Sequence, residues 1–510
     1  MLVTAKRTQQ RTWIKIGVKK DGTITALEAK VIGDNGAYAS WSVNIMRKAG
    51  VLVSGPYEIP NAKVDSYAVY TNNPLTGATR GFGAAETNFC NESHMDEVAK
   101  AIGMDPMEFR LKNALRKNKK TATEHVLDFY VPVETTILEA DKNFHWDEKK
   151  ARPKEVEENI RRGVGMSSMW YGIGFGAGIE DTTDVIAEMH EDGTATLYVG
   201  TVDYGNGSNT TFTMLGAEVL GLTMEQMKIV NGDSSRTLNC GSTVATKQTY
   251  TTGNAVVRAC MQIRKDMFEI GSEILGIPTE EMDLGYGYAY SIKEPKESFE
   301  SRESVESMDK SKRIPIREIS ERFREFGKPM RREGRFMAGL LTEPLNPKTG
   351  MGKAWFPLAF GTHMAEVDVN TKTGKITVNK IVAAHYVGKT INPRALHGQV
   401  VGGISFGVGF ALWEDCNYKD GIPQNVNFDK YKLMRSKDYP DIEVIAIEKD
   451  EKTGPFGAIG IGEPPTIPVA AAIANAVYDA IGVRIFSTPL TKEKVLKAVA
   501  EAGGSSSKHQ

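Results

Sequence analysis

Apolar and polar side chains alternate after a turn dipeptide at three places along the chain. The segments KKDGTITALEAKV, HEDGTATLYVGTV and NTKTGKITVNKIV begin near residues 19, 190 and 370. A short turn followed by a period of two is typical of a hairpin that leads into a half-buried strand. We therefore predict a hairpin and a strand at each of these places.

Apolar positions spaced by three and four residues predict a long helix over TGNAVVRACMQIRKDMFEIGSEILG, with one side buried. Its stripe consists of Val256, Val257, Cys260, Ile263, Met267, Ile270 and Ile274. Two helix starts are also marked, by Asp105 before Pro106 and by the capping pattern from Thr223 to Gln226. Strands and helices mingle without regular βαβ alternation, which favours the α+β class.

The length of 510 residues exceeds what one hydrophobic core usually serves, so at least two domains are expected. The polar segment DEKKARPKEVEENIRRG predicts a boundary near residues 145–162, between domains at 1–155 and 163–502. The charged stretch at about 293–335 is expected to be an exposed insertion with one surface helix. Residues 503–510 are expected to form a disordered tail.

Charge and cysteine usage restrict the function classes. With 63 basic and 64 acidic residues the net charge is -1, which gives no reason to expect a nucleic-acid or anionic-membrane partner. The four cysteines lie far apart, so the sequence has neither a CxxC metal site nor an iron–sulfur ligand set, and a reducing compartment is favoured. The first 15 residues are polar and basic without an apolar core, and we expect a cytoplasmic protein.

Four glycine-rich segments carry the first chemical signal: 79–86, 169–180, 200–210 and 397–409. Glycine lets the backbone approach a ligand closely and exposes N–H donors, so together the segments predict a bulky polar cofactor. A single segment of this kind is more often a tight turn, a bulge or a close helix contact. Neither a P-loop nor a dinucleotide fingerprint is present, which argues against those modes of nucleotide binding.

Two further polar sites have alternative interpretations. The segment GSTVATKQTY at 241–250 places hydroxyls and an amide before the long helix, where N-terminal N–H groups favour an anion, or it is an N-cap cluster. Gln399 either donates to a buried ligand oxygen or satisfies the backbone, and alone the second is favoured.

Glu463 stands in GIGEPP, before the small apolar segment TIPVAAAIANAVYDAIG. Pro464 is expected to push Glu463 toward extended backbone and to fix its position. The following segment predicts a helix that is buried all round. A carboxylate at the edge of such a core can serve as a general base, or it can cap the helix and interact with its dipole.

With these residues the chain resembles the molybdenum-cofactor-binding subunits of the xanthine dehydrogenase and aldehyde oxidase family of molybdenum hydroxylases. The motifs are RGFGAAE at 80–86, GTVDYGNGSNT at 200–210, GSTVATKQTY at 241–250, NPRALHGQVVGG at 392–403 and GIGEPP at 460–465. Each motif is weak alone, and their order makes them specific. The resemblance implies an oxidoreductase with two elongated molybdopterin-binding domains, the first incomplete at its N-terminus.

The resemblance also implies residue roles. Glu463 would be the catalytic base, Arg80 would lie beside the metal, and Phe82 would stack on a planar substrate. Arg47 or Lys48 falls where xanthine-oxidising members carry a substrate-orienting arginine. No side chain would bind molybdenum directly, because the pterin dithiolene holds it. The expected cofactor-binding residues are Gly81, Phe82, Gly205, Asn206, Gly207, Ala245, Thr246, Gln248, Gln399 and Gly462, with Asn206 replacing the usual glutamine of a GQG loop.

The function implied by the resemblance is hydroxylation of an aromatic N-heterocycle of the purine or nicotinate type, with oxygen derived from water. The cofactor would be molybdopterin with molybdenum, with the cytosine dinucleotide as one form. Electrons would pass to partner subunits that carry [2Fe–2S] centres and FAD. A second molybdenum-domain subunit is expected to supply a GGxFGG-type loop and a glutamine that do not occur here, as in nicotinate dehydrogenase-like enzymes, with truncation as the rival explanation.

Two alternatives remain open. Aldehyde oxidation would use the same base and metal with a less polar pocket. A non-catalytic assembly subunit would keep the fold without the cofactor, but the joint presence of Glu463, Gln399 and Arg80 argues against it.

Overall fold

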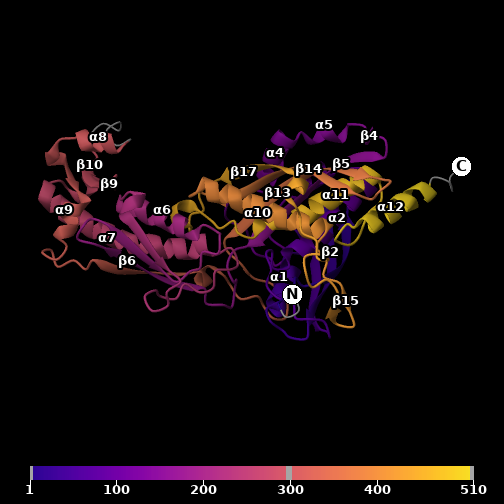
Figure 1. Cartoon of the computed structure of the whole chain (residues 1–510), viewed down its shortest axis with the longest axis horizontal. Helices are drawn as coiled ribbons and strands as arrows, with labels where there is room; N and C mark the ends of the chain where they lie inside the picture. Colours follow the sequence, from indigo (N-terminus) through magenta and orange to yellow (C-terminus); the bar gives the residue numbers. More distant parts are fainter. Residues whose placement is uncertain (1–3, 294–300, 506–510) are drawn as a thin grey trace.

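A computed structural model describes residues 4–293 and 301–505. Its elements form an elongated molecule in which the N-terminal part lies below one end of a large sheet, and a second group of sheets extends to the opposite end (Figure 1). One apolar cluster lies in the N-terminal part and a second lies on one face of the large sheet. The largest extends from the other face of that sheet into the second group of sheets.

The N-terminal part is a three-stranded sheet covered on one face by helices. The strands lie in the order β1-β2-β3, with an antiparallel first pair and a parallel second pair. Helices α1 and α2 pack on the sheet through side chains such as Ile45 and Met95. The elements are β1 (Gln10–Val18), β2 (Ile24–Gly36), α1 (Ser42–Leu52), β3 (Ala62–Tyr70), α2 (Ala84–Ala101) and α3 (Pro106–Asn113).

A five-stranded sheet in the order β17-β14-β13-β5-β4 forms the centre of the molecule. Thr362 on one face contacts Thr136 of α4, while Gly165 on the other face lies against the backbone of α11. The sheet is therefore sandwiched between helices. Its elements are α4 (Val133–Phe144), α5 (Trp146–Lys150), β4 (Glu155–Glu157), β5 (Ile160–Gly172), β13 (Leu358–Asn370), β14 (Ile376–Gly388), α10 (Pro393–Leu412), β17 (Asp441–Glu448), α11 (Val469–Ile481) and α12 (Lys492–Ser505).

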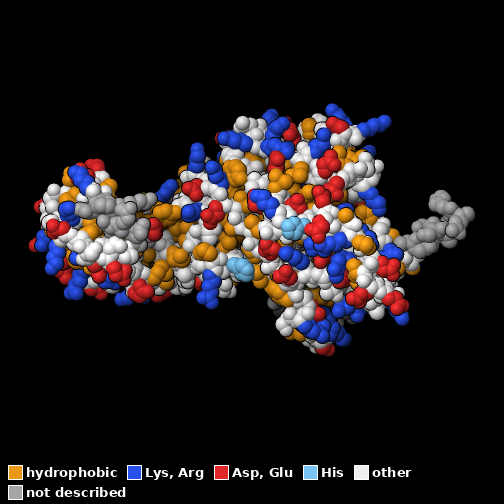
Figure 2. Space-filling view, turned by 90° about the horizontal axis from the view of Figure 1, so that it is seen from above, with side chains coloured by type: hydrophobic (Ala, Val, Ile, Leu, Met, Phe, Trp, Pro, Cys, Tyr) orange, Lys and Arg blue, Asp and Glu red, His pale blue; other side chains and the backbone are white. Residues whose placement is uncertain are grey.

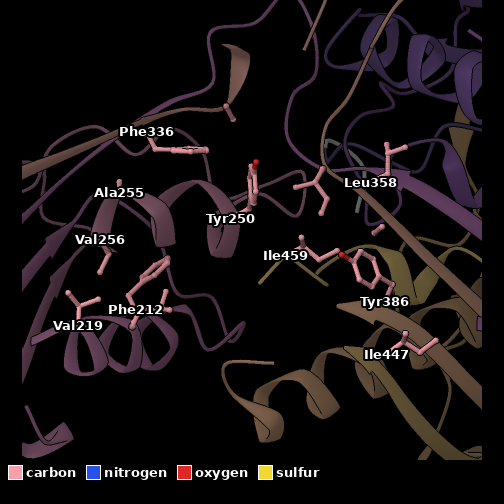
Figure 3. Close-up of a cluster of buried hydrophobic side chains, with 14 of the residues drawn as sticks. Phe212, Val219, Tyr250, Ala255, Val256, Phe336, Leu358, Tyr386, Ile447 and Ile459 are labelled. Atoms are coloured by element: carbon pink, nitrogen blue, oxygen red, sulfur yellow. The ribbon is translucent and has the colours of Figure 1, made fainter. Parts of the chain in front are cut away.

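The opposite end contains a four-stranded sheet, β12-β6-β7-β8, packed against α6 and α7, and a small sheet, β11-β10-β9. Tyr250 at the start of α7 lies between the side chains of this end and those of the five-stranded sheet (Figure 3). The elements are β6 (Thr182–Met189), β7 (Ala195–Val199), α6 (Ser208–Leu220), β8 (Met227–Asn231), α7 (Gln248–Leu275), β9 (Met282–Gly285), β10 (Tyr288–Ser291), α8 (Arg302–Ser307), β11 (Arg313–Pro315), α9 (Ile316–Glu321) and β12 (Arg331–Met337).

Short elements occupy the connections. They are β15 (Tyr418–Lys419) and β16 (Ile422–Pro423), and the 3-10 turns η1 (Met224–Gln226), η2 (Thr279–Glu281), η4 (Lys310–Lys312), η5 (Ala338–Leu341), η6 (Ser436–Asp438), η7 (Pro455–Gly457) and η8 (Pro464–Thr466).

The three alternating segments form β2, β7 and β14, each paired with the strand before it, so the predicted hairpins are confirmed. The prediction of a half-buried strand is wrong for β7, which is buried at all of its positions. The long helix is α7, on which Val257 and Ile274 are only half-buried and the rest of the predicted stripe is buried. Thr223 and Gln226 do form a capping box, but only on the three-residue turn η1. The α+β class is confirmed by the mixed helix and strand content.

The charged stretch at 293–335 differs from the exposed insertion that its composition predicts. Residues 294–300 lie outside the described part, and the remainder forms α8, β11, α9 and most of β12. Val305, Ile316 and Phe323 are fully buried, and Ile316 and Phe323 belong to the largest apolar cluster. This stretch has few apolar residues, but their spacing suits a helix and a strand. These residues pack the stretch against α7 and the small sheet.

Two predicted boundaries also differ. Helices α4 and α5 already pack against the five-stranded sheet, so the change from the N-terminal part precedes residues 145–162. At the other end, α12 continues to Ser505, and only residues 506–510 of the predicted tail lie outside the described part.

Surface charge and helix composition add two observations. On the face in Figure 2, Lys and Arg are interspersed with Asp and Glu, consistent with the net charge of -1. Among the described residues, only α10 is long and apolar enough to cross a membrane by length and composition. It packs against α11 and η8, as core helices also do, so its composition is weak evidence for a membrane span.

Replacing Asp105 with alanine should lower the free energy of unfolding by about 1 kcal/mol, because the Asp105 side chain caps α3. Its Oδ1 accepts hydrogen bonds from the N–H groups of Met107, at 2.7 Å, and Glu108, at 3.3 Å. Chemical denaturation of the two proteins measures the difference. Asp105→Asn keeps an accepting oxygen at the cap and should retain most of the stability; equal losses in both variants would contradict the capping role.

Candidate active site

A cavity of about 530 Å³ lies where the N-terminal part, the five-stranded sheet and the α6–α7 layer meet. Its walls come from all four glycine-rich segments and from the loops before α7 and η8. The following residues line it: Trp41, Asn44, Arg47, Lys48, Ala78, Thr79, Arg80, Phe82, Gly174, Phe175, Ile179, Tyr204, Gly205, Asn206, Ser208, Thr211, Ser242, Thr243, Val244, Ala245, Thr246, Lys247, Gln248, Thr249, Trp355, Gln399, Gly460, Ile461, Gly462 and Glu463.

Glu463 stands directly before η8, with φ -99° and ψ -35°. The prediction of extended backbone at this residue is therefore wrong: Glu463 takes a helical ψ because its carbonyl accepts the Thr466 N–H of the 3-10 turn. The turn is anchored on α10, since the Thr466 hydroxyl donates to the Gly403 carbonyl at 3.1 Å. The predicted buried helix follows as α11, and Glu463 is held at its edge as expected.

Three hydrogen bonds fix the Glu463 residue. Its Oε2 accepts from the Tyr171 hydroxyl at 2.6 Å and from the Gly81 N–H at 3.0 Å. Its own N–H donates to Oγ1 of Thr246 at 3.0 Å. No hydrogen bond from residues 4–293 or 301–505 reaches Oε1, so one carboxylate oxygen is held and the other is left for a ligand.

The backbone that supports Glu463 is strained on two sides. Gly81, Phe82 and Gly83 all have positive φ, which turns the Gly81 N–H toward the carboxylate. Ala245 and Thr246 also have positive φ, 56° and 60°. Non-glycine residues in this region cost about 1–3 kcal/mol each and tend to occur at functional sites.

Arg80 ties the loop before α2 to α10 and to the loop that carries Glu463. Its Nε donates to the Gly462 carbonyl at 2.6 Å, and its Nη2 donates to the Gln399 carbonyl at 3.0 Å and to Oε1 of Gln399 at 3.3 Å. Burial lowers the pKa of Arg80, and the charge of Glu463 opposes this effect. The two charges therefore stabilise each other across the cavity.

The GNG loop is organised by Asp203. Its side chain accepts from the N–H groups of Gly205, Gly207 and Asn209 at 3.0 to 3.2 Å. Burial raises the pKa of Asp203, but these backbone donors outweigh it and hold the pKa below its usual value. At the start of α6, Ser208 lines the cavity, and its hydroxyl is buried without a hydrogen-bond partner among the residues that the structure describes.

Arg47 and Lys48 both line the cavity, from α1, but in different environments. Arg47 is half-buried and donates to the carbonyls of Phe175 at 3.2 Å and Ala177 at 3.3 Å. Lys48 is only 2% exposed, and its Nζ donates to the Gly172 carbonyl at 2.7 Å. Burial lowers the pKa of Arg47, and it lowers the pKa of Lys48 to about 7.

Aromatic rings form one wall. Trp41 stacks on Phe175 with ring centroids 6.1 Å apart and an angle of 6° between the planes, and it meets Phe82 edge-on at 6.3 Å. Behind Phe175 lies a buried ion pair of Lys247 and Asp181. The Asp181 carboxylate also accepts a hydrogen bond from the Phe175 N–H. This wall is suited to a flat ligand.

The structure brings nearly all predicted site residues to the cavity. Gly81 and Gly207 do not line it but lie in its loops. Gln248 lines it near the start of α7, where its amide donates to the Ser242 carbonyl at 3.1 Å. Tyr171, Trp41, Phe175 and the Lys247–Asp181 pair were not predicted; Tyr171 and Phe175 stand in the segment MWYGIGFGAGIE, which the sequence marked only by its glycines.

Within the described ranges, no group of three or more His, Cys, Asp and Glu side chains is placed to hold a metal ion.

Comparisons with known proteins identify relatives over nearly the whole chain. The molybdopterin cofactor-binding domain family matches residues 1–114 and 139–440. A xanthine dehydrogenase molybdenum-binding subunit from Escherichia coli O157:H7 is 29% identical over 493 residues, which are 96% of this chain and 62% of the relative.

Solved structures agree. The aldehyde oxidoreductase from Desulfovibrio desulfuricans superimposes with a TM-score of 0.80 and 28% identity, over 97% of this chain and 49% of that one. The quinoline 2-oxidoreductase from Pseudomonas putida 86 gives 0.84 at 23% identity, over 98% and 63%, and this likeness concerns the fold alone. The chain spans half to about three fifths of the length of these proteins.

Proposed function

Because the chain belongs to the molybdopterin cofactor-binding domain family, we propose that it is the cofactor-binding catalytic subunit of an enzyme that hydroxylates an aromatic N-heterocycle of the purine or nicotinate type. The observation that carries the proposal is the carboxylate of Glu463, held by two donors on Oε2 while Oε1 is left toward the cavity. A fixed carboxylate of this kind is suited to accept a proton from a reacting group.

The residues present fit a bulky polar cofactor. A Cβ at Gly205, which lines the cavity, would meet no atom within 4 Å, so open space lies beside this backbone. The unpartnered Ser208 hydroxyl at the start of α6 is a buried group that requires a partner. Asn206, Thr246, Gln248 and Gln399 are the side chains that would hold the cofactor. When bound, molybdopterin with molybdenum supplies two-electron oxidation of a substrate carbon with oxygen from water.

The chain's own residues would bind and orient the substrate and move one proton. Phe82, Phe175 and Trp41 would hold a planar ring, and Arg47 would orient its polar edge. Glu463 would take the proton at Oε1, and Arg80 would balance its charge. The half-buried guanidinium of Arg47 within the aromatic wall favours a heterocycle over a simple aldehyde.

We also propose that electrons leave through partner subunits that carry [2Fe–2S] centres and FAD. The name of the Escherichia coli relative, a molybdenum-binding subunit, supports a multi-subunit enzyme. The cytosine dinucleotide form of the cofactor, a second molybdenum-domain subunit and a cytoplasmic location stay predictions.

Elemental analysis of the native complex should find near-stoichiometric molybdenum per chain, and turnover in heavy-oxygen water should place the label in the hydroxylated product. The matched reaction in ordinary water under labelled dioxygen should give an unlabelled product. Mass spectrometry of the complex would identify the electron-carrying subunits. A complex without molybdenum, or a product labelled from dioxygen, would contradict the proposed function.

A further inference from the structure

Lys48, Tyr171 and Glu463 form a continuous stack at the edge of the cavity. The Lys48 Nζ lies 3.5 Å from the centroid of the Tyr171 ring, and the Tyr171 hydroxyl donates to Oε2 of Glu463 at 2.6 Å. Resting on the proposed function, we propose that Tyr171 is a positioning residue for the base Glu463, and that Lys48 acts through Tyr171 and does not contact the substrate.

The fold holds Lys48 and Tyr171 in place relative to each other. Tyr171 is the penultimate residue of β5, fully buried and paired with Ala359 of β13. Lys48 comes from α1 and is anchored on the carbonyl of Gly172, the residue after Tyr171. Two adjacent residues of β5 therefore hold the phenol and the ammonium group above it: Tyr171 carries the ring, and the Gly172 carbonyl binds the Lys48 Nζ.

The environment of Lys48 argues against a substrate contact. The side chain is 2% exposed, its Nζ is committed to a backbone carbonyl, and the ring of Trp355 lies 5.1 Å away. In the described part of the chain no carboxylate lies within ion-pair distance of it. The negative charge that acts on Lys48 is that of Glu463, and it raises the pKa of the ammonium group against the larger effect of burial. Arg47 is half-buried and lines the cavity, so it is the cation that we expect a substrate to meet.

Tyr171 is suited to remain a donor. Burial and then the charge of Glu463 raise the pKa of Tyr171 well above its usual value, so the phenol stays protonated while the carboxylate is charged. Below its pKa of about 7, Lys48 places a cation on the ring face. The π electrons attract this cation, which draws density from the ring and makes the hydroxyl a stronger donor. Because both donors hold Oε2, the carboxylate presents Oε1 to the cavity.

Other groups near Glu463 must be considered before a pH effect is assigned to this stack. Arg80 and Tyr204 interact electrostatically with the carboxylate from the opposite side of the cavity, and Thr246 accepts its N–H. Among residues 4–293 and 301–505, neither Arg80 nor Tyr204 makes a hydrogen bond to Tyr171, whereas the Thr246 side chain interacts with the Tyr171 hydroxyl. A change at Tyr171 therefore removes one donor to Glu463 and one partner of Thr246, while the hydrogen bond from the Gly81 N–H to the carboxylate stays in place.

Tyr171→Phe in the purified holoenzyme complex should lower kcat by about 10- to 100-fold with little change in KM, the loss expected for a hydrogen bond to a charged group. The acid limb of the kcat profile should move to higher pH, because a carboxylate that has lost a donor holds its charge less well. Molybdenum content should be unchanged. The matched control is Tyr386→Phe, another buried tyrosine whose hydroxyl donates to a backbone carbonyl, of Lys449, at 2.9 Å outside the cavity; it should leave kcat and the profile unchanged.

Lys48 gives an independent arm. Lys48→Met should lower kcat and move the acid limb in the same direction as Tyr171→Phe, with KM unchanged, and Lys48→Arg should restore part of the loss. Arg47→Met should instead raise KM. If Lys48→Met raises KM as Arg47→Met does, the assignment of Lys48 is overturned.

The outcomes separate the two proposals. If Glu463→Gln keeps full turnover, the proposed function fails. If Glu463→Gln is inactive while Tyr171→Phe behaves like Tyr386→Phe, only the positioning role fails. Should Tyr171→Phe not assemble, the kcat, KM and pH profile of Lys48→Met decide the question.

Discussion

Glu463→Gln is expected to lower kcat by about 10²- to 10⁴-fold, the range that general base catalysis contributes. The amide keeps the shape of the side chain and still accepts hydrogen bonds from Tyr171 and Gly81, but it cannot take a proton. Molybdenum content and the melting temperature should therefore stay at the wild-type values. Steady-state turnover, elemental analysis and thermal denaturation on the same preparation measure all three.

The matched control for Glu463→Gln is Glu321→Gln, an exposed carboxylate on α9 paired with Arg317 at the far end of the molecule. It should leave turnover unchanged. If Glu463→Gln lost its molybdenum together with its turnover, the residue would be holding the cofactor, and the role of base would lose its support.

Arg110→Met should lower the free energy of unfolding by about 3–5 kcal/mol, the cost of leaving a buried charge without its partner. Arg110 is fully buried on α3, where its Nε lies 2.8 Å from Oε2 of Glu92 and its Nη1 lies 2.7 Å from Oδ1 of Asp96. Its Nη2 also donates to the Glu92 carbonyl at 2.9 Å. The variant leaves Glu92 in the core without its cation, while Asp96 keeps an electrostatic interaction with the buried Arg484.

The pH dependence gives a second measure of this effect. Burial already raises the pKa of Glu92 above its ordinary 4.5, and Arg110 opposes the rise. In the variant the folded state binds a proton more tightly than the unfolded state, so stability is lost as the pH rises above 4.5. The difference in unfolding free energy between the two proteins should thus be smallest below that pH and grow above it.

Arg317→Met is the control for Arg110→Met, because it breaks an exposed pair with Glu321 at 3.1 Å. Exposed pairs contribute about 0–1 kcal/mol, so this variant should stay near the wild type. If chemical denaturation gave the two variants equal free energies of unfolding, the predicted contribution of the ion pair between α2 and α3 would be wrong.

The motifs placed most of the candidate residues correctly at the cavity, but they located some residues more precisely than others. Glu463, Gln399 and Arg80 were identified because the motifs in which they stand, such as GIGEPP, are weak alone but occur in an order that resembles one family. Lys48 was identified only to within one position, because adjacent residues on a helix point in different directions and the sequence does not fix the rotation of α1. Only when α1 packs on β2 and β3 does Lys48 become buried while Arg47 stays half-buried.

The backbone of Glu463 shows the limit of a local rule. The residue before proline prefers extended backbone, yet its carbonyl accepts the Thr466 N–H within a turn anchored on α10. The packing of that turn overrides the local preference. Tertiary packing likewise overrides composition where it buries Val305, Ile316 and Phe323, in a stretch whose composition indicates exposure.

The sequence by itself determined the hairpins at β2, β7 and β14, the cap of α3 and the stripe of α7, because each depends on residues within a few positions of one another. Only the tertiary structure decided what surrounds Glu463. The Gly81 N–H is 382 positions from Glu463 and the Tyr171 hydroxyl is 292 positions away. Contacts at such separations are set by how α1, β5, α10 and α11 pack, and no periodicity along the chain records that arrangement.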